Sequence, residues 1–200
     1  MDEKKEQEVS DLGAMLFRKR RTLSRILAMQ FVFQADLKNN WEAASIELKD
    51  FKELAQTPYE EGEHAPFTEG DFKAAWKYAD TLIRGVLEIH GELDAMIADA
   101  AQNWTFHRIS LLDRSILRVA AFEILKSPNG VTPAIAINEA VEIAKSYSIN
   151  NSSRFVNGIL DKIRKTLTDG EKPDQEASPG EKTESPLEPP IDSIAGEANK

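Results

Sequence analysis

Apolar residues recur at helical spacing through most of residues 12–168, and this pattern restricts the fold more than any other feature of the chain. From about Leu12 to Leu37 the apolar positions follow one another at helical intervals. The same spacing returns in the segments 40–55, 68–90, 93–101, 110–127, 133–146 and 152–167. No segment alternates apolar and polar residues as a half-buried strand does. We therefore predict an all-α fold, a compact bundle of about seven helices.

Residues that favour helix starts and stops divide these segments. Thr68, Ser110 and Thr132 each precede an apolar run, and all three are of a type that caps helix N-termini. Two prolines and a glycine indicate that residues 56–67 form a loop. Gly91 is expected to separate two further helices, because glycine weakens a helix interior.

The formal net charge of −9 is unevenly distributed. Residues 1–11 contain five acidic residues and two lysines, and residues 169–200 contain nine acidic residues and three lysines. The segment between them, 12–168, has twenty residues of each sign and is neutral. A strongly acidic protein repels polyanions. Here the acidity belongs to the two ends, so the composition does not exclude a polyanionic partner.

We divide the chain into an acidic flexible N-terminus (1–11), a helical domain (12–168) and an acidic Pro-rich tail (169–200). The tail contains five of the nine prolines and no aromatic residue. It cannot bury enough apolar surface to offset its ordering entropy, and we expect it to be disordered. Two roles stay open for it: a solvated tail, or a tail that competes with RNA for basic residues of the domain.

Several classes of function lack the residues that they need. The chain has no cysteine, so it has no disulfide, thiolate metal site or cysteine nucleophile. Its histidines His64, His90 and His107 form no metal-binding pair, and no glycine-rich phosphate loop is present. Glu139 and Glu142 share a helix, but carboxylates at this spacing are usually solvated or salt-bridged. We therefore expect no enzyme and no cofactor or metal.

The ends and the apolar runs of the chain predict where the protein resides. The first residues are charged and lead into no apolar run of the signal-peptide type. No stretch approaches the roughly 18 apolar residues that a membrane span needs. We expect a soluble cytoplasmic protein with no membrane partner.

Five positive charges lie within the eight residues from 18 to 25: Arg18, Lys19, Arg20, Arg21 and Arg25. On an α-helix, Arg18, Arg21 and Arg25 share one side, and the other two residues flank it. Like charges at this spacing repel one another, and cations near a helix N-terminus oppose its macrodipole. A bound polyanion would relieve both effects. The cluster therefore predicts a nucleic-acid surface, with a solvated helix start as the alternative.

The last predicted helix carries Asn157 and Gly158 in its interior, where glycine costs roughly 1 kcal/mol relative to alanine. Asn157 lies off the apolar stripe, so its amide could bond to a base edge. Phe155 could stack on a base, but it follows the apolar stripe with Ile159 and Ile163, which favours a core position. Gly158 permits either close helix packing or close approach of a ligand, and packing is the more frequent reason.

Three segments together carry a family resemblance. They are the basic run Arg18-Lys-Arg-Arg21 leading into Arg25-Ile-Leu-Ala-Met-Gln-Phe-Val-Phe-Gln-Ala-Asp36, then Leu112-Asp-Arg-Ser-Ile-Leu-Arg-Val-Ala-Ala-Phe-Glu-Ile-Leu125, and then Ile137-Asn-Glu-Ala-Val-Glu-Ile-Ala-Lys145 with Phe155-Val-Asn-Gly-Ile-Leu-Asp-Lys162. In this order they resemble the NusB family of bacterial transcription antitermination factors. The resemblance covers about residues 12–165, and the third segment is the most specific.

The resemblance implies two small three-helix subdomains after a long first helix, and no catalytic activity. It also implies binding of the single-stranded boxA element of nascent ribosomal RNA with ribosomal protein NusE, in an antitermination complex on RNA polymerase. Carried over by position, the basic residues would contact phosphates. The last helix would supply the RNA face, and part of the segment 112–125 would face NusE. The residues concerned are Arg18, Lys19, Arg20, Arg21 and Arg25 for phosphates, Phe155 and Asn157 for the RNA face, and Asp113, Arg114 and Arg118 for NusE.

An RNA-binding antitermination factor is thus the main hypothesis, and two alternatives stay open. One is a helical adaptor that binds only protein. The other is a stand-alone relative of the domain found at the N-terminus of some RNA methyltransferases. The free protein could be a monomer or a homodimer that covers its basic residues. Five phosphate contacts would give RNA binding a log–log salt slope of roughly −3.5.

Overall fold

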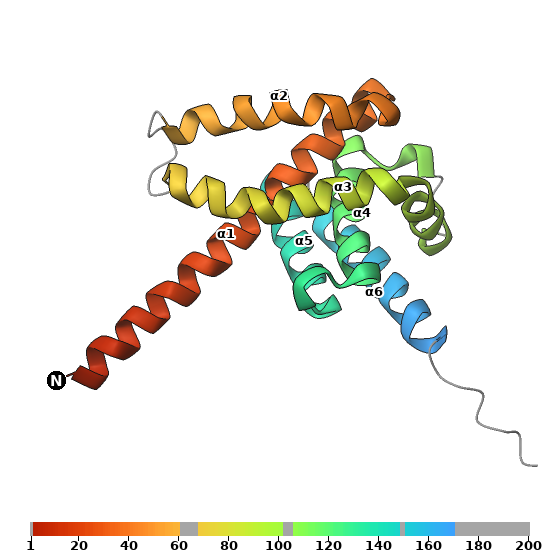
Figure 1. Cartoon of the computed structure of the whole chain (residues 1–200). Helices are drawn as coiled ribbons and strands as arrows, with labels where there is room; N and C mark the ends of the chain where they lie inside the picture. The colour runs from red at the N-terminus through yellow and green to blue at the C-terminus, as the bar shows by residue number, and fades with distance from the viewer. Residues whose placement is uncertain (1, 61–67, 102–105, 149–150, 171–200) are drawn as a thin grey trace, which may run out of the picture.

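The computed structural model describes residues 2–60, 68–101, 106–148 and 151–170. Within these segments the chain is helical and has no strand. The elements are α1 (Asp2–Lys38), α2 (Trp41–Glu60), α3 (Glu69–Ala100), the 3-10 helix η1 (Phe106–Arg108), α4 (Leu111–Lys126), the 3-10 helix η2 (Pro128–Gly130), α5 (Pro133–Tyr147) and α6 (Ser152–Gly170). Figure 1 shows their arrangement. The predicted all-α fold is confirmed.

Two helices are longer than the sequence indicated. α1 begins at Asp2, well before the expected start near Leu12. α2 continues through Pro58 to Glu60, so part of the loop predicted for residues 56–67 is helical. Proline has no N–H, so Pro58 removes one backbone hydrogen bond of α2. Only two residues of the helix follow Pro58, so little of the helix lies beyond the lost bond. The rest of the predicted loop, and most of the tail predicted to be disordered, lie outside the described residues.

α3 is a single, kinked helix where two helices were predicted, and this accounts for the difference between the seven predicted helices and the six α-helices of the described residues. It runs across Gly91 and bends at Ile89, whose backbone angles (φ −121°, ψ 23°) are not helical. A glycine costs a helix only about 1 kcal/mol, and buried apolar residues on both sides offset that cost. Leu93 and Ile97, which follow the bend, are fully buried. Packing therefore continues the helix beyond the bend.

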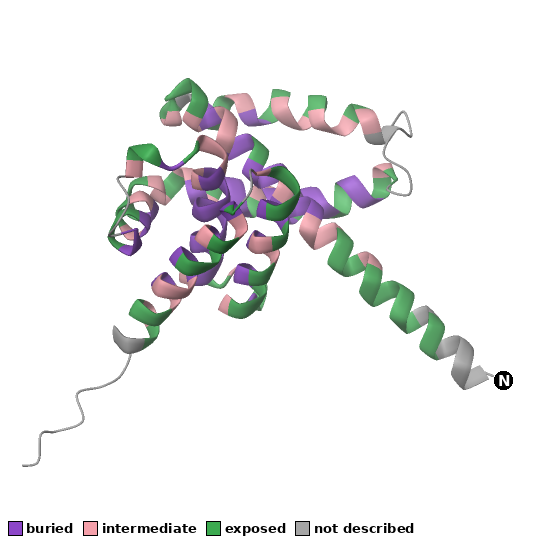
Figure 2. Cartoon of the chain, turned by 180° about the vertical axis from the view of Figure 1, so that it is seen from behind, coloured by how far each residue is buried: buried purple, intermediate pink, exposed green. Residues whose placement is uncertain are grey.

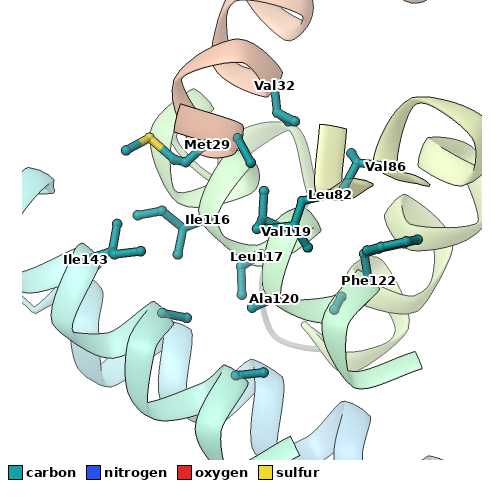
Figure 3. Close-up of a cluster of buried hydrophobic side chains, with 14 of the residues drawn as sticks. Met29, Val32, Leu82, Val86, Ile116, Leu117, Val119, Ala120, Phe122 and Ile143 are labelled. Atoms are coloured by element: carbon teal, nitrogen blue, oxygen red, sulfur yellow. The ribbon is translucent and has the colours of Figure 1, made fainter. Parts of the chain in front are cut away.

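α4 lies at the centre of the bundle and packs against α1, α3, α5 and α6. All of its residues from 115 to 124 are buried. Figure 3 shows its apolar side chains among those of the neighbouring helices. The labelled residues are Ile116, Leu117, Val119, Ala120 and Phe122 of α4, Met29 and Val32 of α1, Leu82 and Val86 of α3, and Ile143 of α5. At roughly 1.5–3 kcal/mol for each fully buried side chain, this core is the main stabilising contribution.

The predicted N-caps are confirmed. The Thr68 hydroxyl accepts a hydrogen bond from the backbone N–H of Asp71, and the Asp71 carboxylate accepts one from the backbone N–H of Thr68. Ser110 and Thr132 accept equivalent bonds at the starts of α4 and α5. Each such cap contributes about 1 kcal/mol to stability. The capping box fixes Asp71 at the start of α3, where its carboxylate also accepts a hydrogen bond from Arg20 of α1.

The N-terminal part of α1 extends away from the bundle, as Figures 1 and 2 show from opposite sides. Residues 10–15 are exposed, and burial of α1 begins at Leu23. The basic residues 18–21 lie where the helix leaves the bundle. They are therefore close enough to α3 and α5 to be positioned by them, and they still face solvent.

Gly85 of α3 marks a tight approach between two helices. A Cβ atom at this position would lie 2.0 Å from the ring of Phe122 on α4. We expect Gly85→Ala to lower the free energy of unfolding by about 1–3 kcal/mol, because the buried ring has to move. The matched variant is Gly91→Ala on the same helix, whose Cβ would meet no atom within 4 Å. It is expected to raise stability by up to about 1 kcal/mol in urea titrations. Equal effects of the two variants would contradict the packing described.

Candidate nucleic-acid interface

Residues 17–25 of α1 are held in place by hydrogen bonds from neighbouring helices. On the α3 side, Arg20 Nε donates to Asp71 Oδ1 at 2.8 Å. On the α5 side, the Thr22 hydroxyl donates to Glu139 Oε2 at 2.7 Å. Backbone and hydroxyl hydrogen bonds from Thr68 hold the pKa of Asp71 below its usual range, and Arg20 adds to this effect. The basic segment is thus fixed in orientation by one carboxylate on each side, Asp71 on α3 and Glu139 on α5.

Arg25 does not lie on the surface. Its side chain is 3% exposed, and its Nε donates to both carboxylate oxygens of Glu123 on α4, at 2.9 and 3.1 Å. Its Nη1 donates to Glu139 at 3.1 Å, and the Tyr78 hydroxyl also donates to Glu123. Burial, together with the bond to Glu123, raises the pKa of Tyr78 well above its usual range. The expectation that Arg25 contacts a phosphate is not supported, because its charge is already paired inside the protein.

The positive charges that face solvent belong to the residues before Arg25. Arg18 and Lys19 are exposed, and neither forms an ion pair with any residue in the described ranges. The Arg20 side chain is 40% exposed beyond its bond to Asp71. Because α1 begins at Asp2, these groups lie inside the helix and not at its N-terminus, and they give this part of α1 a positive surface that ion pairs of the protein neutralise only in part.

Arg21 is arranged differently from its neighbours. Its guanidinium carbon lies 3.8 Å from the ring centroid of Tyr78 and 5.2 Å from that of Phe17. Stacking of this kind stabilises a cation by roughly 0.5–2 kcal/mol. Its Nη1 is buried and has no hydrogen-bond partner among the described residues. The guanidinium therefore lies close to two aromatic rings and has one donor without a partner among the described residues.

Two hollows open beside this segment, with volumes of about 450 and 370 Å³. Both are lined by Phe17, Arg21 and Asn129. Lys77 of α3 also lines the first hollow, and Asn138 of α5 lines the second. Sequence analysis did not identify these residues other than Arg21, since α3, η2 and α5 come together only in the fold. The one local signal was an aromatic residue, Phe17, directly before a basic run.

The predicted RNA-facing residues of α6 have different environments. Phe155 is half-buried and packs against the core, whereas Asn157 and Gly158 are exposed. A Cβ atom at Gly158 would meet no atom within 4 Å among the described residues. Packing among the described residues therefore does not require a glycine at position 158. From the sequence, close helix packing is the more frequent reason for a glycine at such a position. The role of Asn157 stays a prediction.

The two halves of the predicted interface lie on separate helices. α1 and α6 each pack on α4, and α5 lies between them in Figure 1. Glu139 connects α5 to α1, and the other side of α5 packs against α6. The basic residues and Asn157 thus do not line one pocket. A ligand that contacts both has to extend across α5.

The residues predicted to face a protein partner are turned inward. Asp113 is 6% exposed and accepts hydrogen bonds from the hydroxyls of Ser148 and Ser152. Arg114 and Arg118 both pair with Asp36 of α1, at 3.0 and 2.8 Å. Arg118 is also 2% exposed and bonds to Asp94. These side chains join helices of the bundle, so the geometry does not support direct contact with NusE.

The described residues contain no group of three or more histidine and carboxylate side chains placed to hold a metal ion. None of the described helices has an apolar stretch long enough to cross a membrane.

Comparison with known proteins gives the family. Residues 22–165 match the model of the NusB family, which is more than half of the chain. The chain belongs to the NusB family. The match begins directly after the basic residues 18–21, so the family relationship gives no support for a function of these four residues. The family relationship gives the protein a role in transcription antitermination, as a non-enzymatic factor.

Individual relatives agree with this assignment. The transcription antitermination protein NusB of Desulfotalea psychrophila is 39% identical over 144 residues, which cover 72% of this chain and 94% of that protein. The NusB protein of Elusimicrobium minutum is 46% identical over 106 residues, covering 50% of this chain and 76% of that protein. Among solved structures, T. maritima NusB is 29% identical with a TM-score of 0.53, covering 72% of this chain and 90% of that chain.

Proposed function

We propose that this NusB-family protein binds boxA-like single-stranded RNA together with ribosomal protein NusE, within an antitermination complex on RNA polymerase. The observation that carries the RNA proposal is the segment 18–21. Its positive charges face solvent, and ion pairs with α3 and α5 hold the helix that presents them. Asn157 on α6 extends the proposed surface beyond α5. Arg25 is excluded from it, and NusE would bind through residues other than Asp113, Arg114 and Arg118.

A binding titration tests this proposal. Labelled boxA-like RNA and a scrambled RNA of the same length are titrated with the full chain, with and without NusE. We expect tighter binding of the boxA-like RNA and a further gain with NusE. With four phosphate contacts instead of five, the log–log salt slope should be roughly −2.8. Equal affinity for the two RNAs in both conditions would contradict boxA recognition, and the adaptor alternative predicts no RNA binding at all.

Gly158 provides a separate prediction. We expect Gly158→Ala to raise the free energy of unfolding by up to about 1 kcal/mol, because the new methyl group meets no atom and alanine favours a helix. The same variant should lose RNA affinity severalfold, since the methyl group would stand where RNA approaches α6. Urea unfolding and RNA titration measure the two effects. Gly91→Ala is the matched control, because it should raise stability by a similar amount and leave RNA affinity unchanged. Unchanged RNA affinity of Gly158→Ala would remove Gly158 from the interface.

A further inference from the structure

The two hollows beside residues 17–21 share three lining residues, and one of them carries an aromatic ring on which a planar ligand could stack. Phe17, Arg21 and Asn129 line both hollows. Basic residues line both hollows, Lys77 on the α3 side and Arg18 on the α5 side. The one carboxylate among the lining residues, Glu139, is paired with Arg25. A ligand that fits these two hollows carries negative charge, to match the basic residues. It also has a planar group small enough for a volume of a few hundred cubic ångströms. An unpaired nucleotide has both properties.

Phe17 supplies the stacking surface. It is 58% exposed, and the guanidinium carbon of Arg21 lies 5.2 Å from its ring centroid. Proteins that bind single strands stack bases on exposed aromatic rings next to positive charge. An exposed phenylalanine next to a fixed arginine matches that arrangement.

Arg21 and Asn129 supply the polar groups. The buried Nη1 of Arg21 lacks an acceptor among the described residues, and a buried unpaired donor is costly. Asn129 is exposed in η2 with a left-handed backbone (φ 55°, ψ 30°), which places it between the hollows. Its amide can donate and accept at once, as base edges require.

We propose that Phe17, Arg21 and Asn129 form a subsite for one unpaired RNA nucleotide. The base stacks on the ring of Phe17, Asn129 bonds to the base edge, and the guanidinium of Arg21, which lines both hollows, donates to an oxygen of the same nucleotide. This inference rests on the proposed RNA binding and adds the place where a base is recognised on the α1 side. The subsite differs from Asn157, which lies beyond α5.

Phe17→Ala tests the stacking contact, and Leu12→Ala is its matched control. Leu12 is 52% exposed on the same helix and lines neither hollow. With boxA-like RNA we expect Phe17→Ala to weaken binding roughly 5- to 150-fold, which is the range for loss of one base stack. The salt slope should not change, because no phosphate contact is removed. Phe17→Trp should keep the affinity, and Leu12→Ala should leave it unchanged.

RNAs with a single abasic nucleotide, moved along the sequence, locate the base. We expect one abasic position to weaken wild-type binding and to have no further effect on Phe17→Ala. Asn129→Gly keeps the left-handed backbone and should reduce discrimination between bases at that position. If wild type binds RNA with the expected salt slope and Phe17→Ala binds equally tightly, the subsite is wrong and the proposed function stands. If wild type does not bind RNA, both are wrong.

Discussion

Replacing Glu123 with alanine is expected to lower the free energy of unfolding by about 3–5 kcal/mol, the range for leaving a buried charge without its partner. Glu123 is fully buried and accepts hydrogen bonds from both Arg25 and Tyr78. Its removal leaves the guanidinium of Arg25, 3% exposed, with only Glu139. Urea unfolding followed by circular dichroism measures the change.

Two further variants make the stability test specific. Glu142→Ala removes an exposed carboxylate of α5 whose one ion-pair partner in the described part of the chain is Lys145, and its effect should stay within about 0.5 kcal/mol. The double variant Arg25→Met/Glu123→Leu should recover part of the loss, because neither charge is then left alone. A cost below about 1 kcal/mol for Glu123→Ala would contradict the buried pairing of Arg25.

Replacing both Arg18 and Lys19 with glutamine is expected to halve the salt dependence of RNA binding, from a slope of roughly −2.8 to roughly −1.4. Extrapolated from 1 M salt, this is a loss of affinity of roughly 25-fold at 0.1 M. Neither side chain has an ion-pair partner among the described residues, so stability should change by less than about 0.5 kcal/mol. Anisotropy titrations across salt concentrations measure the slope.

The control for this charge change is Lys38→Gln/Lys49→Gln, which removes the same net charge from exposed sites at the C-terminal end of α1 and on α2. We expect its slope to equal that of wild type. If the two double variants lose the same affinity, the effect comes from net charge and not from a contact surface on α1.

The helices could be predicted from the sequence because their signals are local. The caps Thr68, Ser110 and Thr132 start helices as their side chains predict. The two helix breakers act differently from the prediction for separate reasons. Pro58 lies only two residues before the end of α2, so the helix continues past it for less than one turn. Near Gly91 the predicted interruption is a kink at Ile89, and the buried Leu93 and Ile97 keep the chain helical beyond it. The free-energy cost of a helix-weakening residue can be judged from the local sequence. The packing that offsets this cost depends on residues that are distant in the sequence.

The candidate site was predictable only in part. Helical spacing placed Arg25 on the same side as Arg18 and Arg21, and all three do line one hollow. The sequence could not show that Glu123 and Glu139 bury Arg25 from two other helices. The inward position of Arg118 was missed for the same reason, because its carboxylate partners lie on α1 and α3. Charge alone does not show whether a side chain pairs within the protein or with a partner.

Photocrosslinking tests most directly whether the basic segment of α1 is the RNA surface. Single-stranded boxA-like RNA containing 4-thiouridine is crosslinked to the full chain, and the modified peptides are identified by mass spectrometry. We expect crosslinks in the segment 17–21 and near Asn129, lost in the Arg18→Gln/Lys19→Gln variant and retained in the Lys38→Gln/Lys49→Gln control. Crosslinks confined to α2, or equal yields in the two double variants, would contradict RNA binding by this surface.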